Sequence, residues 1–383
     1  MKLELTDEQS AVRATAKKAA RDLLAPDAVT NDREARFPRE NLKQLARLGL
    51  MGVNVPFQYG GSEAGVVAYA LAVQELAAGC AGTTVAMMVT NMVAEAIVEW
   101  GDESQRSRFL PRLLSGDDWL TASFCLSEPG SGSDASSLCT TARRDGDDYI
   151  LDGTKAWVTS GGHSGLYLIM ARTGGIAGAR GISTFLVQGD NPGLIATKPE
   201  DKMGLRASTT TQIVLDGCRV PMRDRLGNEG TGFRVAMRAL DGGRIGVSAQ
   251  ALGIATAALT AATRYATERR QFDRRIADFG AIQDMIADSA TELDAGTLLC
   301  LRAASLKDKG VPHSKEAAMS KVFCTEAAND ICHRAVQIHG GYGYTRDYPV
   351  ERHLRDVRVT RIYEGTSEVQ RIVVAREALN GVN

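Results

Sequence analysis

The sequence lacks the features that mark several classes of protein. Its 383 residues contain no low-complexity tract and no collagen-like repeat. No uninterrupted apolar stretch approaches the roughly 20 residues that span a bilayer, so membrane insertion is not expected. An excess of one charge is missing as well, since 45 basic and 46 acidic residues give a net charge of -1. A nucleic-acid-binding protein would carry a basic excess, and the sequence therefore predicts no nucleic-acid partner.

Patterns typical of disulfides, metal sites and export are also missing. The seven cysteines are odd in number and show no C-x-x-C spacing, and the five histidines form no ligand pattern with them. Reduced thiols and no metal site are therefore expected. The opening residues MKLELTDEQS include acidic side chains and no apolar segment, unlike a signal or transit peptide. The prediction is a cytoplasmic protein.

The pattern of apolar, β-branched and turn residues changes twice along the chain, and these changes predict three domains. Residues 1–120 carry apolar residues at helical spacing and predict an all-α domain. Residues 121–230 contain short segments rich in β-branched and aromatic residues, bounded by turn residues, and predict a small β-barrel. Residues 231–383 return to long helical segments with short connections, which predict a four-helix bundle. The expected fold class is α+β and multidomain.

One stretch near the C-terminus, RIYEGTSEVQRI (361–372), raises a question of chemistry. Thr366 or Ser367 can cap a helix there, and Ser367-x-x-Gln370 fits a capping box. Glu364 stands just before that helix start, between an aromatic residue and a glycine. It is either a solvated carboxylate favoured by the helix dipole or a base directed at a substrate.

Six motifs occur along the chain in one order. They are FCLSEPGSGSD (124–134), KAWVTSG (155–161), DKMGLRAST (201–209), LDGGRIGVSAQALGIA (240–255), QIHGGYGYTRDYPVERHLRD (337–356) and IYEGTSE (362–368). Each is weak alone, because a Gly/Ser loop such as the first is more often only a turn. Together they resemble the acyl-CoA dehydrogenase family over essentially the whole chain. The C-terminal half is most similar to the short-chain and branched-chain enzymes.

The resemblance implies a flavoenzyme with a carboxylate base. The family converts an acyl-CoA thioester to the trans-2-enoyl-CoA, and the β hydrogen leaves as hydride to N5 of FAD. Glu364 matches the base that takes the α proton, its backbone N–H matches a donor to the thioester oxygen, and Gly365 leaves room for the substrate. Some members place the base just before an arginine on the long helix. That position is Gly243 here, so Glu364 is left as the candidate.

The same match implies which residues hold FAD. Trp157 would lie against the flavin ring and Thr159 would bond near N5. A departure concerns Gly280, where the family usually has a glutamine that contacts FAD, so one contact is missing or replaced. The full set implied for FAD is Phe124, Cys125, Leu126, Ser127, Gly132, Ser133, Trp157, Val158 and Thr159, with Thr366, Ser367 and Glu368 at the last helix start, and with Arg269, Gln337, Ile338, His339, Gly340 and Gly341 supplied by a neighbouring subunit.

For the substrate, the match implies that Ser133 contacts the pantetheine part of CoA. Asp241 and Arg244 match residues that hold the 3′-phosphoadenosine end. These two residues stand three apart on a helix, and without the match they would be interpreted as a surface ion pair.

The length of the acyl group should depend on the helical segment 89–100. Its polar members are Thr90, Asn91 and Glu95. They either shorten and polarise the end of an acyl tunnel, or they cap a helix and face another subunit. The expected substrate is an acyl-CoA with a short, branched or cyclic acyl group.

The resemblance also implies partners. The family forms homo-oligomers, commonly tetramers, and passes electrons to an electron-transfer flavoprotein. Two other functions stay open on the sequence alone. One is a flavoenzyme of the same fold with other chemistry, such as an oxidase, monooxygenase or desulfinase, and the other is a non-catalytic acyl-CoA-binding protein.

Overall fold

The computed structural model describes residues 4–117 and 119–380, and the first part of the chain is helical, as its residue spacing predicted. Two of its helices begin with capping boxes, Thr6 with Gln9 and Asp102 with Gln105, in which each side chain bonds the other residue's backbone. The helices are α1 (Asp7–Ala19), α2 (Ala25–Glu34), α3 (Arg39–Arg47), α4 (Gly65–Trp100) and α5 (Glu103–Leu114), with a π-helical turn (Ala20–Leu24) between the first two.

The long helix α4 is buried along most of its length and packs against α6 (Gly232–Glu268). Both helices are long and apolar enough to cross a membrane, which corrects the expectation that no such stretch exists. However, 89% and 72% of their most apolar windows are buried inside the protein. They are the core of the helical layers, because alanine and glycine let their backbones approach each other closely.

The middle part forms one eight-stranded sheet. Its order is β6-β7-β3-β2-β4-β5-β8, and β1 pairs in parallel with β4. Alternate residues face a separate core that includes Val158, Tyr167 and Phe185. The expected small β domain is confirmed, although within the described residues β6 and β8 are not bonded to each other and the sheet stays open there. The strands are β1 (Ala122–Cys125), β2 (Thr141–Asp145), β3 (Asp148–Thr159), β4 (Leu166–Arg172), β5 (Ile182–Gln188), β6 (Leu194–Ala196), β7 (Thr210–Pro221) and β8 (Arg225–Leu226).

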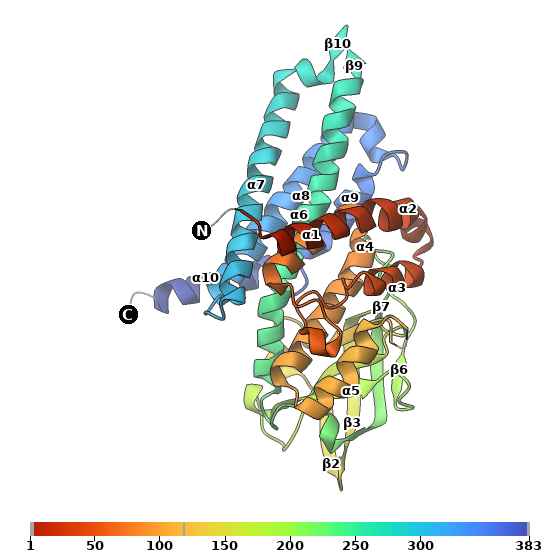
Figure 1. The fold of residues 1–383 in the computed structure, drawn as a ribbon, viewed down its shortest axis with the longest axis vertical. Helices are drawn as coiled ribbons and strands as arrows, with labels where there is room; N and C mark the ends of the chain where they lie inside the picture. Colours follow the sequence, from red (N-terminus) through yellow and green to blue (C-terminus); the bar gives the residue numbers. More distant parts are fainter. Residues whose placement is uncertain (1–3, 118, 381–383) are drawn as a thin grey trace.

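The last part of the chain is helical again. Helices α6, α7 and α8 pack against one another, while α10 packs on α8 and projects from the body (Figure 1). The hairpin of β9 (Arg270–Gln271) and β10 (Arg274–Arg275) lies at one end of the long axis, and the β domain lies at the other (Figure 1). The long helical segments expected over 231–383 are confirmed: after α6 come α7 (Gly280–Asp308), α8 (Ser314–His339), α9 (Val350–Val357) and α10 (Ser367–Asn380).

Candidate active site

Glu364 lies in a two-residue turn directly before α10. Glu364 and Gly365 both have positive φ angles, 53° and 90°. This conformation is unfavourable for a glutamate and easy for a glycine. The Oε2 atom of Glu364 is buried and has no hydrogen-bond partner. The alternative of a solvated loop carboxylate is therefore wrong, and a buried oxygen without a partner calls for an explanation such as a role in chemistry.

Gly243 on α6 makes room for this carboxylate. A Cβ atom built at Gly243 would lie 1.8 Å from Oε2 of Glu364 and 3.1 Å from the sulfur of Met92. Any side chain at position 243 would force the carboxylate of Glu364, the far end of a flexible side chain, to move. A side chain at position 243 and the carboxylate at position 364 therefore compete for the same space. In this chain position 243 is a glycine, and the carboxylate of Glu364 occupies that space.

The surroundings of Glu364 make it a weaker acid than usual. Burial raises the pKa of its carboxyl group from 4.5 to about 7, while the positive charges of Arg244 and Lys321 oppose this rise. A base with a pKa near the working pH is partly ionised and still binds a proton well. The site thus has the properties of a general base at neutral pH.

Asp241 and Arg244 form a buried ion pair on α6. The Nη1 atom of Arg244 lies 2.5 Å from Oδ1 of Asp241, and their side chains are 8% and 13% exposed. Ser314 donates a second hydrogen bond to Asp241, at 2.6 Å. The interpretation as a surface pair is therefore wrong. Arg244 lies close enough to affect the pKa of Glu364, and its Nε atom is buried without a partner.

The start of α10 is capped by Thr366, one of the two expected candidates. Thr366 accepts a hydrogen bond from the backbone N–H of Val369 at 3.3 Å. The predicted Ser367–Gln370 capping box is wrong, because the amide of Gln370 donates to the carbonyls of Glu364 and Gly365 instead. The hydroxyl of Ser367 is buried without a partner, and Glu368 is exposed. The free N-terminal groups and hydroxyls of α10 suit an anion such as a pyrophosphate.

The polar residues of α4 divide into two kinds. Thr90 donates to the carbonyl of Ala86 and accepts from the N–H of Ala122, so it joins α4 to β1. Asn91 accepts from the buried N–H of Val53 at 3.0 Å. These bonds give both residues a structural role.

Glu95, in contrast, lies 2.5 Å from the ammonium of Lys307 on α7. This ion pair lines a narrow cavity of about 10 Å³, room for about one water molecule, together with Asn91, Met92 and Gly243. The cavity therefore adjoins the carboxylate of Glu364 through Gly243.

The ends of β1 and β3 bring together the first group of predicted flavin residues. The N–H of Ala156 donates to the carbonyl of Ser127 at 2.9 Å and joins the segment 124–127 to the segment 157–159. A register shift between Lys155 and Val158, with φ of 60° at Trp157, turns the indole outward, where it is 66% exposed. Cys125 and Val158 are buried in the sheet, so only their backbone can face a cofactor.

The Gly/Ser loop after β1 is anchored by a buried ion pair. Lys155 is fully buried, and its ammonium lies 2.7 Å from Glu128. Glu128 also accepts hydrogen bonds from the backbone N–H groups of Cys139 and Thr140. Beyond this anchor, Gly132 has no atom within 4 Å of a Cβ position, and Ser133 is exposed. The Lys155–Glu128 ion pair therefore fixes the start of the loop, while the backbone at Gly132 stays accessible to a ligand.

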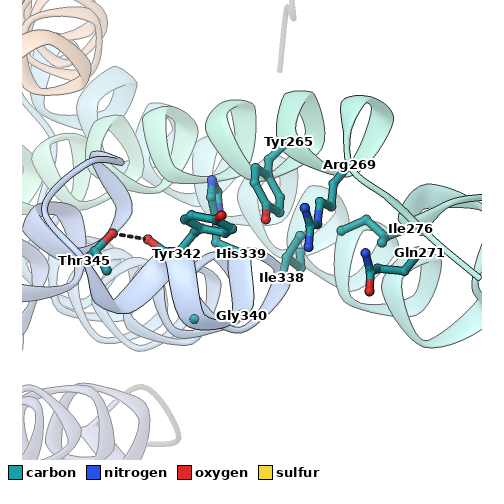
Figure 2. Close-up of a pocket in the computed structure, with 10 residues that line it drawn as sticks. Tyr265, Arg269, Gln271, Ile276, Ile338, His339, Gly340, Tyr342 and Thr345 are labelled. Carbon is teal, nitrogen blue, oxygen red and sulfur yellow. Dashed lines mark hydrogen bonds between the residues drawn. The ribbon is translucent and has the colours of Figure 1, made fainter.

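A second group of predicted flavin residues lines a pocket of about 510 Å³ between α6 and the segment after α8 (Figure 2). Arg269, Ile338, His339, Gly340 and Gly341 line it, and Gln337 does not. Five further lining residues were not predicted: Tyr265, Gln271, Ile276, Tyr342 and Thr345. Tyr342 could have been predicted to line this pocket, because it directly follows the predicted residues Gly340 and Gly341. Nothing in the sequence around Tyr265 on α6 indicated that it lines the pocket.

The two groups lie far apart in one chain. The pocket of Figure 2 is built beside the β9–β10 end of the molecule, whereas β1 and β3 belong to the β domain near the other end (Figure 1). The residues present suit a dinucleotide: an exposed indole and an open glycine loop in one group, and an arginine with aromatic rings in the other.

The fold and the site define a class: chains in which two helical domains flank a β domain and enclose a buried carboxylate. Sequence profiles of the acyl-CoA dehydrogenase N-terminal, middle and C-terminal domains match residues 6–117, 123–218 and 230–379. The chain belongs to the acyl-CoA dehydrogenase family.

The named relatives cover almost the whole chain. It is 44% identical to the mitochondrial short-chain specific acyl-CoA dehydrogenase of Bos taurus, over 98% of this chain and 91% of the relative. Butyryl-CoA dehydrogenase from Megasphaera elsdenii is 39% identical with a TM-score of 0.96, over 99% of this chain and 100% of that structure. A chain from work on the electron transferring flavoprotein of Acidaminococcus fermentans is 42% identical with a TM-score of 0.97, over 99% and 100%.

Proposed function

We propose that this protein dehydrogenates a short-chain acyl-CoA between Cα and Cβ, with Glu364 as the base that takes the α proton. One observation carries the proposal: the carboxylate of Glu364 is buried, has one oxygen without a partner, and has a pKa of about 7. Removing a proton next to a thioester needs such a base and a donor for the charge that develops on the thioester oxygen.

The chain supplies that donor close to the base. The backbone N–H of Glu364 bonds to no other group in the part of the chain that the structure describes, and it can donate to the thioester oxygen. Gly365, at the turn, lets a substrate pass close to the backbone. Asp241, Arg244 and Ser133 are kept as proposed contacts of the CoA part, and Arg244 has in addition an electrostatic effect on Glu364.

FAD is the cofactor, and it supplies the acceptor for the hydrogen that leaves Cβ. Trp157, Thr159 and the open loop around Gly132 would hold its flavin part. The pyrophosphate would meet Thr366 and Ser367. The pocket around Arg269 and His339 would hold the dinucleotide part of a flavin bound mainly by another copy of the chain.

A short acyl group is favoured by the closed space beside Glu364. The cavity there is narrow, and the ion pair between Glu95 and Lys307 lines it with charge. A long alkyl chain would have to displace or desolvate these two groups, which is unfavourable. The similarity to a short-chain specific relative supports the same conclusion.

Assembly and electron transfer complete the proposal. The two separated flavin half-sites support a homo-oligomer, and a tetramer is the proposed form. An electron-transfer flavoprotein is the proposed electron acceptor, supported by the similarity to the Acidaminococcus fermentans chain. A cytoplasmic location is proposed as well.

The decisive experiment is a substrate panel on the purified, flavin-loaded protein. Straight, branched and cyclic acyl-CoAs are tested with an artificial electron acceptor, and separately with oxygen alone. We expect turnover with four- to six-carbon substrates and the artificial acceptor. Fast turnover with oxygen alone would favour an oxidase, and no reduction of the flavin by any acyl-CoA would contradict the proposal.

A further inference from the structure

The turn that carries Glu364 is held from inside the protein. Two consecutive residues with positive φ, one of them a glutamate, persist only where the surrounding structure stabilises them. Two fully buried side chains do this here. The ammonium of Lys321 donates to the carbonyl of Gly365 at 2.8 Å, and the amide of Gln370 donates to the same carbonyl at 3.1 Å.

Lys321 is an unusual residue to find in this place. It lies on α8, 44 positions before Gly365, and it is 0% exposed. A lysine is almost never fully buried unless it is paired. Yet in the described part of the chain no carboxylate oxygen lies within 4 Å of its ammonium. Its hydrogen-bond acceptor is a backbone carbonyl of the active-site turn.

The charges around the base identify what this lysine faces. Arg244 on α6 and Lys321 on α8 both lower the pKa of Glu364. Burial raises the pKa of Tyr69 on α4 and of the adjacent Tyr363, and the Glu364 carboxylate adds to both rises. Burial lowers the pKa of Lys321 to about 8, while the carboxylate of Glu364 raises it. The lysine and the glutamate therefore each favour the charged form of the other.

We propose that Lys321 is a positioning residue for the base: its ammonium fixes the Glu364–Gly365 turn through the Gly365 carbonyl and supplies positive charge behind the carboxylate. This inference rests on the proposed function of Glu364. Among the described residues, no other side chain of α8 forms a hydrogen bond with the Glu364–Gly365 turn. Loss of the ammonium leaves the carboxylate with Arg244 as its one nearby cation, so that the base holds its proton to higher pH.

The test uses two variants of Lys321 that both lose the positive charge and differ in whether a hydrogen-bond donor to the Gly365 carbonyl remains. Lys321→Met removes the charge and the hydrogen bond, whereas Lys321→Gln removes the charge and keeps a donor. The rate of anaerobic flavin bleaching by butyryl-CoA is measured from pH 5.5 to 9.5. In both variants we expect the midpoint of the pH profile to rise by about one pH unit, which lowers the rate about tenfold on the acid side. The matched control is Lys315→Met on the same helix, which should leave the midpoint unchanged.

A second readout does not depend on turnover. The melting temperatures of proteins with Glu364 and with Glu364→Gln are compared across pH, once with Lys321 and once with Lys321→Gln. The stability difference within each pair should begin near pH 4.5 and stop growing at the folded-state pKa of Glu364, and this upper pH should move upward when the lysine charge is lost. If wild type bleaches but neither the midpoint of the rate profile nor this upper pH moves, the role of Lys321 is refuted. If wild type does not bleach at all, the proposed function fails, while the melting comparison still reports on Lys321.

Discussion

Replacing Glu364 with glutamine should abolish activity and, at the same time, stabilise the protein at high pH. The amide has nearly the same shape as the protonated acid but cannot take a proton. Burial raises the pKa of Glu364 from 4.5 to about 7. At about 1.4 kcal/mol for each pH unit, keeping the ionised carboxylate in the folded protein above pH 7 costs about 3 kcal/mol relative to the unfolded chain.

The sign follows from where the proton is held. Between pH 4.5 and 7 the folded protein keeps the Glu364 proton that the unfolded chain has lost, so the stabilisation from this group is present below pH 4.5 and is lost as the pH rises through 7. The glutamine variant does not titrate there. It should therefore match wild type near pH 4.5 and exceed its unfolding free energy by about 3 kcal/mol at pH 8.

The assay is thermal or urea unfolding of both proteins at pH 5 and pH 8, together with anaerobic bleaching of the flavin by butyryl-CoA. Glu377→Gln on α10, the helix that follows Glu364, is the control, because this carboxylate is partly exposed and pairs with Arg376. Bleaching should fall by a factor of about 10² to 10⁴, the usual contribution of a general base. A stability difference that is equal at the two pH values would refute the buried, proton-holding carboxylate. Retained bleaching would refute its role as base.

Three further predictions concern the space around the site. Gly243→Ala places a Cβ 1.8 Å from the Glu364 carboxylate, so we expect a loss of about 1–3 kcal/mol of stability and at least a tenfold drop in kcat/KM; unchanged kinetics would contradict the competition for space. Replacing both Glu95 and Lys307 with alanine should raise turnover of octanoyl-CoA relative to butyryl-CoA about tenfold, measured in the artificial-acceptor assay, and an unchanged ratio would place the acyl end elsewhere. Gly280→Gln enters open space at the start of α7 and should tighten FAD binding about fivefold in a flavin titration, as one added hydrogen bond would; equal affinity would mean that no contact is missing there.

Local sequence patterns predicted the elements well, because a helix face or a strand alternation depends on near neighbours. The long helices and the β segments between the helical parts follow from short-range spacing. The predicted capping box at the start of α10 failed because of a contact outside the local pattern. Gln370 fits a capping box with Ser367, but it bonds the turn of Glu364 instead, because that turn presents two carbonyls within reach of its amide.

The sequence by itself determined the family, the candidate base and the absence of a rival at Gly243, since these depend on which residues stand in which order. Only the tertiary structure decided what kind of base Glu364 is. Burial sets its pKa together with Arg244 on α6 and Lys321 on α8, which are distant along the chain, and Lys321 also supports its turn. Desolvation and Coulomb interactions act through space between residues that are distant along the chain. The residues next to position 364 in the sequence therefore do not predict the pKa of Glu364.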